Sequence, residues 1–479
     1  MREFIGALRA ALPRPSGHRA GQASVSAVRT LVLGAVLMLA GCVMIPSYQR
    51  PAAPVPEHFP EQQGDSALSG AEQSWRLFVG DERLRRLIEL ALLNNRDLRI
   101  AVLNVEQERA QYRITRSASY PTVDAGASLS KQRTMGVTSS QWSASVGVTA
   151  YELDLFGRVR SLNQQALETY FATEEAQRAA QVLLVAEVAT QYFALRAAEE
   201  QMRVAQDTLD AVSQSYQLNK IRFEAGDSNE LDLRTAEGQV QSAQFDVLGY
   251  QRQVSQARNA LELLLGQPLP PDLPAEPAFD DEALLSPVPA GLPSGLIARR
   301  PDILQAEHTL KAANANIGAA RAAFFPTISL TGSVGTASAD LTHLFAAGSG
   351  TWNFSPQISL PIFTGGKTRA QLESARVSER IDVASYEKSI QSAFREVADA
   401  LAAVQTYAQQ VQVEATAIAA EQRRLELATI RYRQGEDSYL NVLSAQQDLY
   451  TAQQGRLQAQ YGRLSGQISL YQSLGGGWQ

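Results

Sequence analysis

The chain has 479 residues, of which 45% are hydrophobic, 19% charged and only 7% aromatic, and its formal net charge is −6. A single cysteine excludes an intrachain disulfide and a cysteine-rich zinc site. The four histidines leave too few partners for a histidine-based metal site or a Cys–His dyad; they are His18, His58, His308 and His343. Without the first 41 residues, which hold five arginines and one glutamate, the chain carries −10. Such a surface repels phosphate backbones, so no nucleic-acid partner is expected.

Residues 1–41 have the features of a lipoprotein signal peptide. Arginines precede the apolar run Leu31–Ala40, which is too short to span a bilayer because a spanning helix needs roughly 20 residues. The run ends in Leu39-Ala40-Gly41-Cys42, a tetrapeptide that resembles the bacterial lipoprotein signal. We therefore expect cleavage before Cys42, diacylglycerol on its thiol and an acylated N-terminus. The alternative is a lone buried cysteine at the end of a short core helix.

The residue after the cysteine is Val43, not aspartate, and in the lipoprotein-sorting pattern this implies export to the outer membrane. Several acyl chains, each stabilised by about 0.8 kcal/mol per buried CH₂, anchor a protein far better than one chain. We expect residues 42–75 to form an acylated, extended N-terminal segment. No other cofactor is expected.

The remaining chain contains two copies of one unit. Gly157 and Gly226 bracket 68 residues without Gly or Pro, and Gly366 and Gly435 bracket another 68. The flanking segments also match: Tyr120-Pro121-Thr122 with Phe325-Pro326-Thr327, Arg222-Phe223-Glu224-Ala225-Gly226 with Arg431-Tyr432-Arg433-Gln434-Gly435, and Leu231-Asp232-Leu233 with Leu440-Asn441-Val442. We assign a first repeat to 76–266, a second to 295–474 and a tail to 475–479. The proline-rich stretch 267–294 between them is expected to be an extended connector on the outside.

Each repeat is expected to open with a shorter helical run, near 82–118 and 295–323, and to close with two long helices. These long helices are expected over 158–225 and 228–265 in the first repeat, and over 367–434 and 438–474 in the second. Good helix formers dominate the stretches 158–225 and 367–434. At 1.5 Å per residue, 68 residues make a rod of about 100 Å, which is longer than any globular core is deep.

The first rod has apolar residues on more than one flank: Val182, Val185, Ala189 and Tyr192 on one, with Leu183, Ala186 and Phe193 beside them. A helix with two apolar flanks needs a neighbour on each side, which favours a closed ring of helices over a two-stranded zipper. An elongated helical hairpin without a lumen is the alternative. Gly226 and Gly435 are the expected hairpin-tip turns, since glycine allows a left-handed helix cap.

Strand patterns lie between the helices, in β-hairpins expected over 121–153 and 326–363. In the second hairpin Trp352, Phe354, Ile358 and Leu360 alternate with Asn353, Ser355, Gln357 and Ser359. Period-two alternation over about ten residues is typical of a membrane β-strand. A strand of a soluble sandwich gives the same pattern. Four strands cannot close a barrel, and lipid tolerates no open edge. The barrel must therefore be shared between chains; a dimer gives eight strands and a trimer twelve.

With these features in place, the chain resembles the outer-membrane channel lipoproteins of tripartite RND-type efflux pumps, the OprM-like branch of the TolC family. The resemblance spans nearly the whole chain, and its most specific segments are Tyr151-Glu152-Leu153-Asp154-Leu155-Phe156-Gly157-Arg158, Arg299-Arg300-Pro301-Asp302-Ile303 and Ile317-Gly318-Ala319-Ala320-Arg321-Ala322-Ala323-Phe324-Phe325-Pro326. It implies a mainly α-helical fold with membrane β-structure. In that fold a homotrimer forms a twelve-strand β-barrel continuous with a periplasmic α-helical barrel. A periplasmic adaptor and a proton-driven inner-membrane transporter are the implied partners.

The resemblance also implies a gate where the helices of the second repeat converge. The family pattern places a leucine and, four residues later, an aspartate on the inward face; the matching residues here are Leu440 and Ser444. The leucine is kept and the aspartate is replaced. Glu436, Asp437 and, in the first repeat, Asp232 are candidates for the negative field. Alternatively, these acids only compensate helix dipoles.

Two further gate candidates, Tyr432 and Arg431, could tie neighbouring hairpins together or simply face solvent. The leading hypothesis for function is a passive, gated duct that carries drugs or other toxic small molecules through the outer membrane. The alternatives are the adaptor lipoprotein of such a pump, or a metal or other dedicated exporter of the same architecture. An enzyme is not expected, because the sequence lacks HExxH, CxxC, GxSxG and GxGxxG patterns.

Overall fold

The computed structural model describes residues 43–59, 74–288 and 299–476 and divides into two compact units. One unit contains all four strands and is drawn from Met1–Pro46, Arg116–Asn163 and Ala315–Glu373. The other is helical and is drawn from Ser47–Thr115, Gln164–Asn314 and Ser374–Gln479. Each unit contains segments of both repeats, so the two compact units do not correspond to the two repeats.

The helices of the described residues are α3 (Trp75–Phe78), α4 (Glu82–Asn94), α5 (Arg96–Ser117), α6 (Arg158–Glu224), α7 (Glu230–Leu265), α9 (Pro301–Ala322), α10 (Lys367–Arg433) and α11 (Tyr439–Ser473), with 3₁₀ turns η2 (Glu282–Leu284) and η3 (Leu341–His343). The strands are β1 (Val123–Thr134), β2 (Val137–Leu153), β3 (Thr327–Ser338) and β4 (Gly350–Ser359). None of the helices within the described residues combines the length and the hydrophobicity that a membrane-crossing helix requires.

The helical run expected over 82–118 is interrupted at Asn95, which separates α4 from α5. The Asn95 side chain accepts a hydrogen bond from the backbone N–H of Leu98 (2.9 Å) and donates one to the carbonyl of Leu264 (2.9 Å). An asparagine that caps a new helix in this way competes with continuation of the old one. The run expected over 295–323 is helical from Pro301, and residues 289–298 lie outside the described chain.

The four strands form one antiparallel sheet in the order β1-β2-β3-β4. Its register places apolar residues opposite apolar ones, as in Ala125–Val146, Val146–Val334 and Ile328–Ile358. Polar residues pair on the other face, as in Ser128–Ser143 and Ser333–Asn353. Because side chains alternate along a strand, this pairing gives the sheet one apolar face and one polar face.

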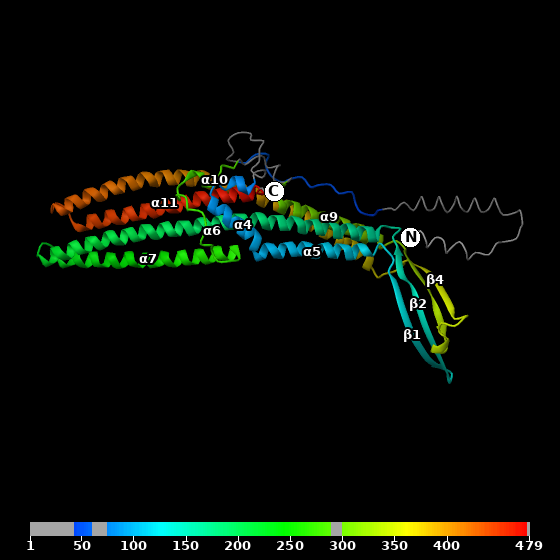
Figure 1. Ribbon diagram of the computed structural model, residues 1–479. Coiled ribbons are helices and arrows are strands. Elements are labelled where there is room, and N and C mark those ends of the chain that lie inside the picture. Colours follow the sequence, from blue (N-terminus) through cyan, green and yellow to red (C-terminus); the bar gives the residue numbers. More distant parts are fainter. Residues whose placement is uncertain (1–42, 60–73, 289–298, 477–479) are drawn as a thin grey trace. The chain divides into compact units, whose positions relative to one another are not determined.

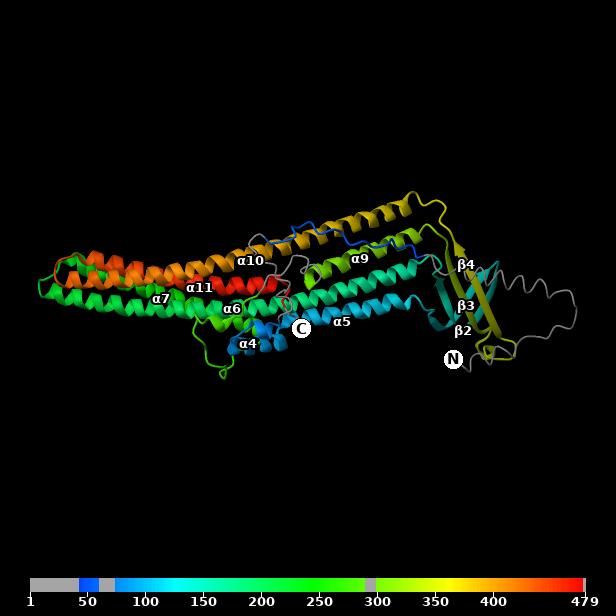
Figure 2. The ribbon, with the colours of Figure 1, turned by 90° about the horizontal axis from the view of Figure 1, so that it is seen from above.

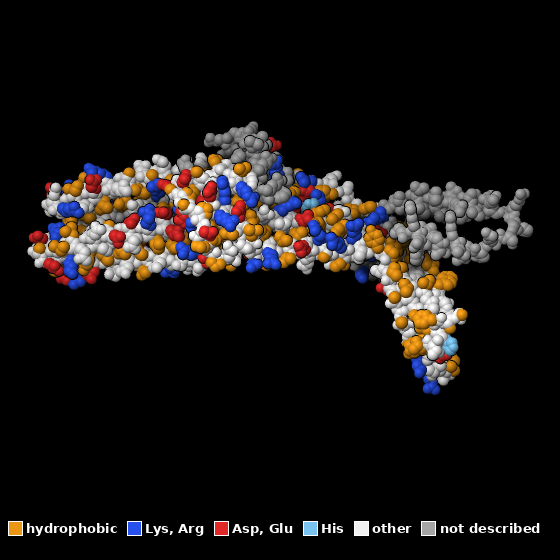
Figure 3. All heavy atoms as spheres, viewed as in Figure 1, with side chains coloured by type: hydrophobic (Ala, Val, Ile, Leu, Met, Phe, Trp, Pro, Cys, Tyr) orange, Lys and Arg blue, Asp and Glu red, His pale blue; other side chains and the backbone are white. Residues whose placement is uncertain are grey.

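A β-bulge interrupts the ladder between Val148 and Tyr151 of β2. Ala150 lies there at φ 51°, and its N–H donates to the hydroxyl of Thr331 (3.1 Å). One extra residue shifts the alternation by one position, so Tyr151 pairs with Leu330 on the apolar face. Figure 3 shows hydrophobic and uncharged polar side chains over most of the visible face of the strand-bearing unit.

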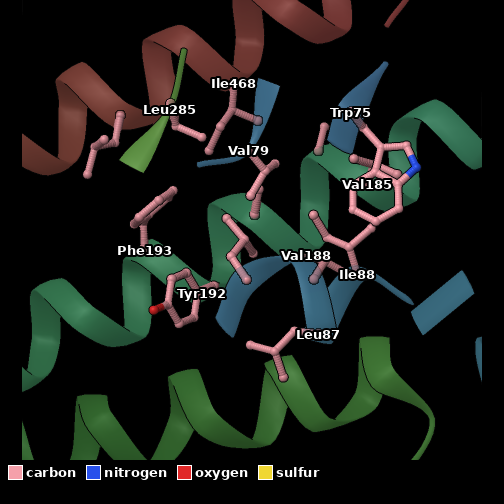
Figure 4. Close-up of a cluster of buried hydrophobic side chains, with 14 of the residues drawn as sticks. Trp75, Val79, Leu87, Ile88, Val185, Val188, Tyr192, Phe193, Leu285 and Ile468 are labelled. Atoms are coloured by element: carbon pink, nitrogen blue, oxygen red, sulfur yellow. The ribbon is translucent and has the colours of Figure 1, made fainter. Parts of the chain in front are cut away.

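The helical unit has its largest core where α3 and α4 pack with α6, α7 and α11 (Figure 4). Most of the apolar residues expected on the flanks of α6 are buried there, and Tyr192 is 1% exposed, with its hydroxyl donating to Asp81 (2.7 Å). Leu183 is the exception at 43% exposed. Burying a large side chain of this kind stabilises the fold by about 1.5–3 kcal/mol.

The expectation that the connector lies on the outside is wrong for part of it. Phe279, Leu284 and Leu285 are at most 6% exposed and belong to the largest core. Leu285 also forms an isolated antiparallel bridge with Val79, next to α4. Prolines exclude a long helix from this stretch, but they leave its apolar side chains free to be buried.

In the helical unit α6 with α7, and α10 with α11, form two antiparallel hairpins that lie side by side, with both turns at the same end (Figures 1 and 2). Side chains of α11 bond to α6: Gln446 donates to the hydroxyl of Ser215 (3.4 Å) and Gln454 to the carbonyl of Gln201 (3.2 Å). The hairpin tips therefore meet as neighbours, and all but one of the candidate functional residues of the sequence lie near them.

Candidate gate at the hairpin tips

Both hairpin tips turn through a glycine in the left-handed conformation, Gly226 at φ 81° and Gly435 at φ 78°. At the first tip the N–H of Gly226 donates to Phe223 (3.0 Å) and that of Asp227 to Arg222 (2.8 Å). At the second, Gly435 donates to Tyr432 (3.1 Å) and Glu436 to Arg431 (3.0 Å). This paired pattern satisfies the last carbonyls of α6 and α10, and it needs a residue that tolerates positive φ.

Tyr432 ties the second hairpin to the first. It is 7% exposed, and its hydroxyl donates to Oδ1 of Asn219 on α6 (2.6 Å). The guanidinium of Arg222 lies over its ring, 4.7 Å from the centroid, and Tyr439 packs against it at 5.5 Å. Burial raises the pKa of the Tyr432 hydroxyl. Within one chain, Tyr432 therefore bonds the second hairpin to the first.

Arg431 makes its contact within its own tip. Its Nε lies 3.4 Å from Oδ2 of Asp437. The other carboxylate oxygen, Oδ1, accepts hydrogen bonds from the backbone N–H of Ser438 (2.9 Å) and from the amide of Asn441. The backbone bond from Ser438, followed by the bond from Asn441, lowers the pKa of Asp437. The carboxylate thus links residues on both sides of the second turn, and neighbouring Glu436 lies exposed in the turn.

Asp232 lies in the first turn of α7 and is linked to the helix-capping residue Asn229. The N–H of Asp232 donates to Oδ1 of Asn229 (2.9 Å), and the amide of Asn229 donates back to Oδ2 of Asp232 (3.2 Å). An acid in the first turn of a helix is stabilised by the helix dipole. The structural role weighed for this acid is thus present at this site.

Leu440 and Ser444 lie on one face of α11. Leu440 is 65% exposed, and Ser444 is half-buried. The hydroxyl of Ser444 accepts a hydrogen bond from Nη2 of Arg424 (3.0 Å) and donates one to Oδ2 of Asp448 (3.3 Å). Sequence reasoning missed Arg424 and Asp448. Asp448 was recognisable, because it follows Ser444 at helical spacing on the same face.

Cys42, the predicted lipidation site, lies outside the described residues. Immediately after it, in the strand-bearing unit, the carbonyl of Met44 accepts a hydrogen bond from Arg321 (3.2 Å). Ile45 lies so close to Gly318 that a Cβ there would fall 2.7 Å from its side chain. In the helical unit, Arg50 pairs with the buried carboxylate of Glu307 (2.5 Å). Residues that follow the cysteine are therefore fixed against α9.

The family model of outer membrane efflux proteins matches residues 87–267 and 292–476. The chain belongs to this family, and the two matched blocks correspond to its two repeats. It is an outer-membrane protein of mainly α-helical, TolC-like fold with an internal duplication.

Among characterised relatives, the chain is 48% identical over 457 residues to the toluene efflux pump outer membrane protein TtgC of Pseudomonas putida, covering 92% of this chain and 94% of that one. It is 43% identical over 461 residues to the cation efflux system protein CusC of Escherichia coli, covering 95% and 100%. Among solved structures, the open state of the Neisseria gonorrhoeae MtrE outer membrane channel is similar at a TM-score of 0.85 and 42% identity, covering 91% of this chain and 99% of that one.

Proposed function

We propose that three copies of this chain form the passive, gated exit duct of a tripartite efflux pump. The four-stranded sheet carries the proposal. Within the described residues, β1 and β4 each pair on one side only, and both strands are exposed along their whole length. Lipid does not tolerate a free edge. Three copies supply about twelve strands and enclose a lumen, whereas two supply about eight, which side chains fill.

The duct needs partners that supply energy and a sealed passage. A periplasmic adaptor and a proton-driven inner-membrane transporter fill these roles. Support comes from the relatives, which are named as outer membrane proteins of efflux pumps. Acyl chains on Cys42 would hold each copy in the membrane at the start of the segment that packs on α9. An adaptor role for this chain is not proposed, because both repeats match the channel family.

The proposed cargo is toxic organic molecules, since relatives at 48% identity are named for toluene, solvents and antibiotics. A metal-cation exporter is the second candidate, because CusC is named for cation efflux. To test this, the chain is expressed with its adaptor and transporter in cells that lack outer-membrane efflux channels. Tolerance of toluene and of several unrelated antibiotics is expected to rise. Tolerance of metal cations alone would favour the second candidate.

Assembly and anchoring are tested separately. Chemical crosslinking of the purified protein should give a ladder that ends at three copies, and planar bilayers should show ion conductance. A crosslinked ladder ending at two, or an absence of conductance, contradicts the duct. Metabolic labelling with palmitate should mark the wild-type chain and leave the Cys42→Ser variant unlabelled. A labelled variant contradicts the proposed anchor.

The gate is tested at Leu440. Replacing Leu440 by alanine is expected to raise single-channel conductance and to increase uptake of a large antibiotic, because the side chain narrows the closed end. Leu231 holds the matching place in the first hairpin and is 74% exposed, so Leu231→Ala is the matched control. Equal effects of the two variants would place the constriction elsewhere.

A further inference from the structure

An ion cluster joins the two helices of the second hairpin above its tip. Nη1 of Arg424 on α10 lies 2.6 Å from Oδ2 of Asp448 on α11 and 3.0 Å from Oε2 of Glu421. Nη2 of the same guanidinium bonds to Ser444 (3.0 Å). Arg424 and Asp448 are 47% and 50% exposed, so the pair is open to water and to ions. With two carboxylates and one guanidinium, the cluster carries one net negative charge per chain.

Within the described residues, the first hairpin has no ion cluster that joins its two helices at this level. When Gly226 is aligned with Gly435, Arg424, Ser444 and Asp448 fall opposite Ser215, Thr235 and Gln239, none of which is charged. The first hairpin therefore forms without an ion pair between its two helices at this level, where Arg234 pairs with Glu230 and Glu237 on its own helix. An ion pair as exposed as Arg424–Asp448 also adds little to stability, typically below about 1 kcal/mol. Hairpin stability alone does not explain the cluster.

Asp448 shares a helix face with the gate leucine. Leu440, Ser444 and Asp448 follow one another at intervals of four residues, which places them along one side of α11. Val442 lies about 160° from the middle of this stripe and is buried. At 1.5 Å per residue, Asp448 is about 12 Å beyond Leu440 along the helix. Asp448 is turned by about 80° from Leu440, so if Leu440 faces the duct, as the proposed function requires, Asp448 lies at the edge of the same face.

We propose that Asp448 carries the fixed negative charge of the closed end in place of residue 444, and that Arg424 sets how much of that charge a solute meets. This inference rests on the proposed duct. Three copies bring three such clusters to one level of the lumen. Fixed charges in a narrow passage act on every ion that crosses it, and they act most strongly at low salt. The guanidinium compensates one carboxylate of each cluster.

The experiment measures reversal potentials of the full-length, acylated protein in planar bilayers under a gradient of potassium chloride at about 0.1 M, where the Debye length is about 10 Å. Arg424→Gln unmasks Asp448 and is expected to raise the potassium-to-chloride permeability ratio about two- to fivefold. Asp448→Asn is expected to lower the ratio by a similar factor. The double variant should lie near the wild type, because each change removes one charge of opposite sign.

Arg423→Gln is the matched control. Arg423 is the next residue on α10, is 63% exposed and pairs with Glu426 on its own helix (2.5 Å). The Arg423→Gln substitution removes the same charge from the same helix but breaks no contact with α11. The potassium-to-chloride permeability ratio of this variant should therefore stay near the wild-type value. Arg424→Lys keeps the charge and should restore most of the wild-type ratio. Far-UV circular dichroism and crosslinking to the full oligomer check that each variant assembles.

The inference is overturned if Arg424→Gln and Asp448→Asn change the permeability ratio no more than Arg423→Gln, or if both shift it in the same direction. It is also overturned if Arg424→Lys behaves like Arg424→Gln, because the contacts of Arg424 would then matter and not its charge. Failure of the proposed duct gives a different result: the wild-type protein itself would not conduct. A conducting wild type with charge-insensitive variants leaves the duct intact and rejects the role of Asp448.

Discussion

Phe223 and Tyr432 hold matching places just before the turn glycines of the two hairpins, yet Phe223 is 39% exposed and Tyr432 only 7%. The hydroxyl of Tyr432 reaches Asn219 on α6, whereas Phe223 has no polar atom with which to reach a partner. Duplication has kept the turn and changed what surrounds it. The second tip is bonded to the first hairpin, and we expect its local stability to depend more strongly on Tyr432 than that of the first tip depends on Phe223.

The tips also begin their returning helices differently. Asn229 caps α7 with its side chain, whereas Ser438, at the matching place, makes no side-chain capping bond to α11. At the second tip Asp437 instead bonds to Ser438, Asn441 and Arg431. A neutral helix cap is thus replaced by a charged turn residue, and we expect this charge to make the second tip responsive to pH.

The largest expected effect concerns the aromatic pair. Tyr432→Ala removes a buried ring, and changes of this kind cost about 3–5 kcal/mol. We expect that loss in the free energy of local opening at the second tip, measured by native-state hydrogen exchange. Phe223→Ala should cost less than about 2 kcal/mol, because that ring is partly in water already. Equal losses in the free energy of local opening at the two tips would contradict the expected difference between them.

The turn glycines should behave alike. Gly226 and Gly435 have positive φ, and a Cβ on either would meet no atom within 4 Å. The cost of alanine is therefore set by the backbone alone, at about 1–2 kcal/mol for each tip. Hydrogen exchange at the two tips measures both values in one experiment. A much larger loss at Gly435 would show that its neighbours constrain the turn in a way that the geometry does not reveal.

The caps should differ. Asn229→Ala removes a side-chain cap and is expected to weaken the first turn of α7 by about 1 kcal/mol. Ser438→Ala removes a hydroxyl that makes no cap, so the first turn of α11 should lose only a few tenths of a kcal/mol. Amide exchange in residues 230–233 and 439–442 reports the two changes. A cost at Ser438 equal to that at Asn229 would contradict the absence of a side-chain cap at Ser438.

Much of this architecture follows from local sequence. The two 68-residue runs without Gly or Pro mark the long helices, and their bounding glycines adopt the left-handed turns that the pattern suggests. The alternation of Trp352, Phe354 and Ile358 gives the faces of β4. These features depend on periodicity and on backbone freedom, both of which are local properties of the chain.

The features that the sequence did not predict have two causes. Some depend on contacts between residues far apart in the chain, and others on competition between two local structures. Asn219 and Tyr432 are 213 residues apart, so their bond could be inferred only from the packing of one hairpin on the other. Asn95 ends α4 because its side chain caps α5 and reaches Leu264. The bulge at Ala150 is invisible in the alternation that runs up to it.

The smallest expected effect is the response of the second tip to acid. Hydrogen bonds from Ser438 and Asn441, with the charge of Arg431, hold the pKa of Asp437 below its ordinary value. In the unfolded chain this carboxyl should titrate near about 3.9. Because its folded pKa is lower, its stabilisation is complete above the unfolded value and is lost as pH falls through the folded one. Protection of residues 436–441 should therefore decrease below about pH 4.

The first tip supplies a comparison, because the uncharged Ser228 stands opposite Asp437, and Asp232, the acid of that tip, lies in the first turn of α7. Hydrogen exchange at pH 5, 4 and 3, corrected for the intrinsic rate, compares the two tips in one sample. Asp437→Asn should flatten the pH response of the second tip while keeping an acceptor for Ser438. An unchanged response in that variant would assign the acid sensitivity to another group. A flattened one would show that the charge of Asp437 is what makes the second tip sensitive to acid.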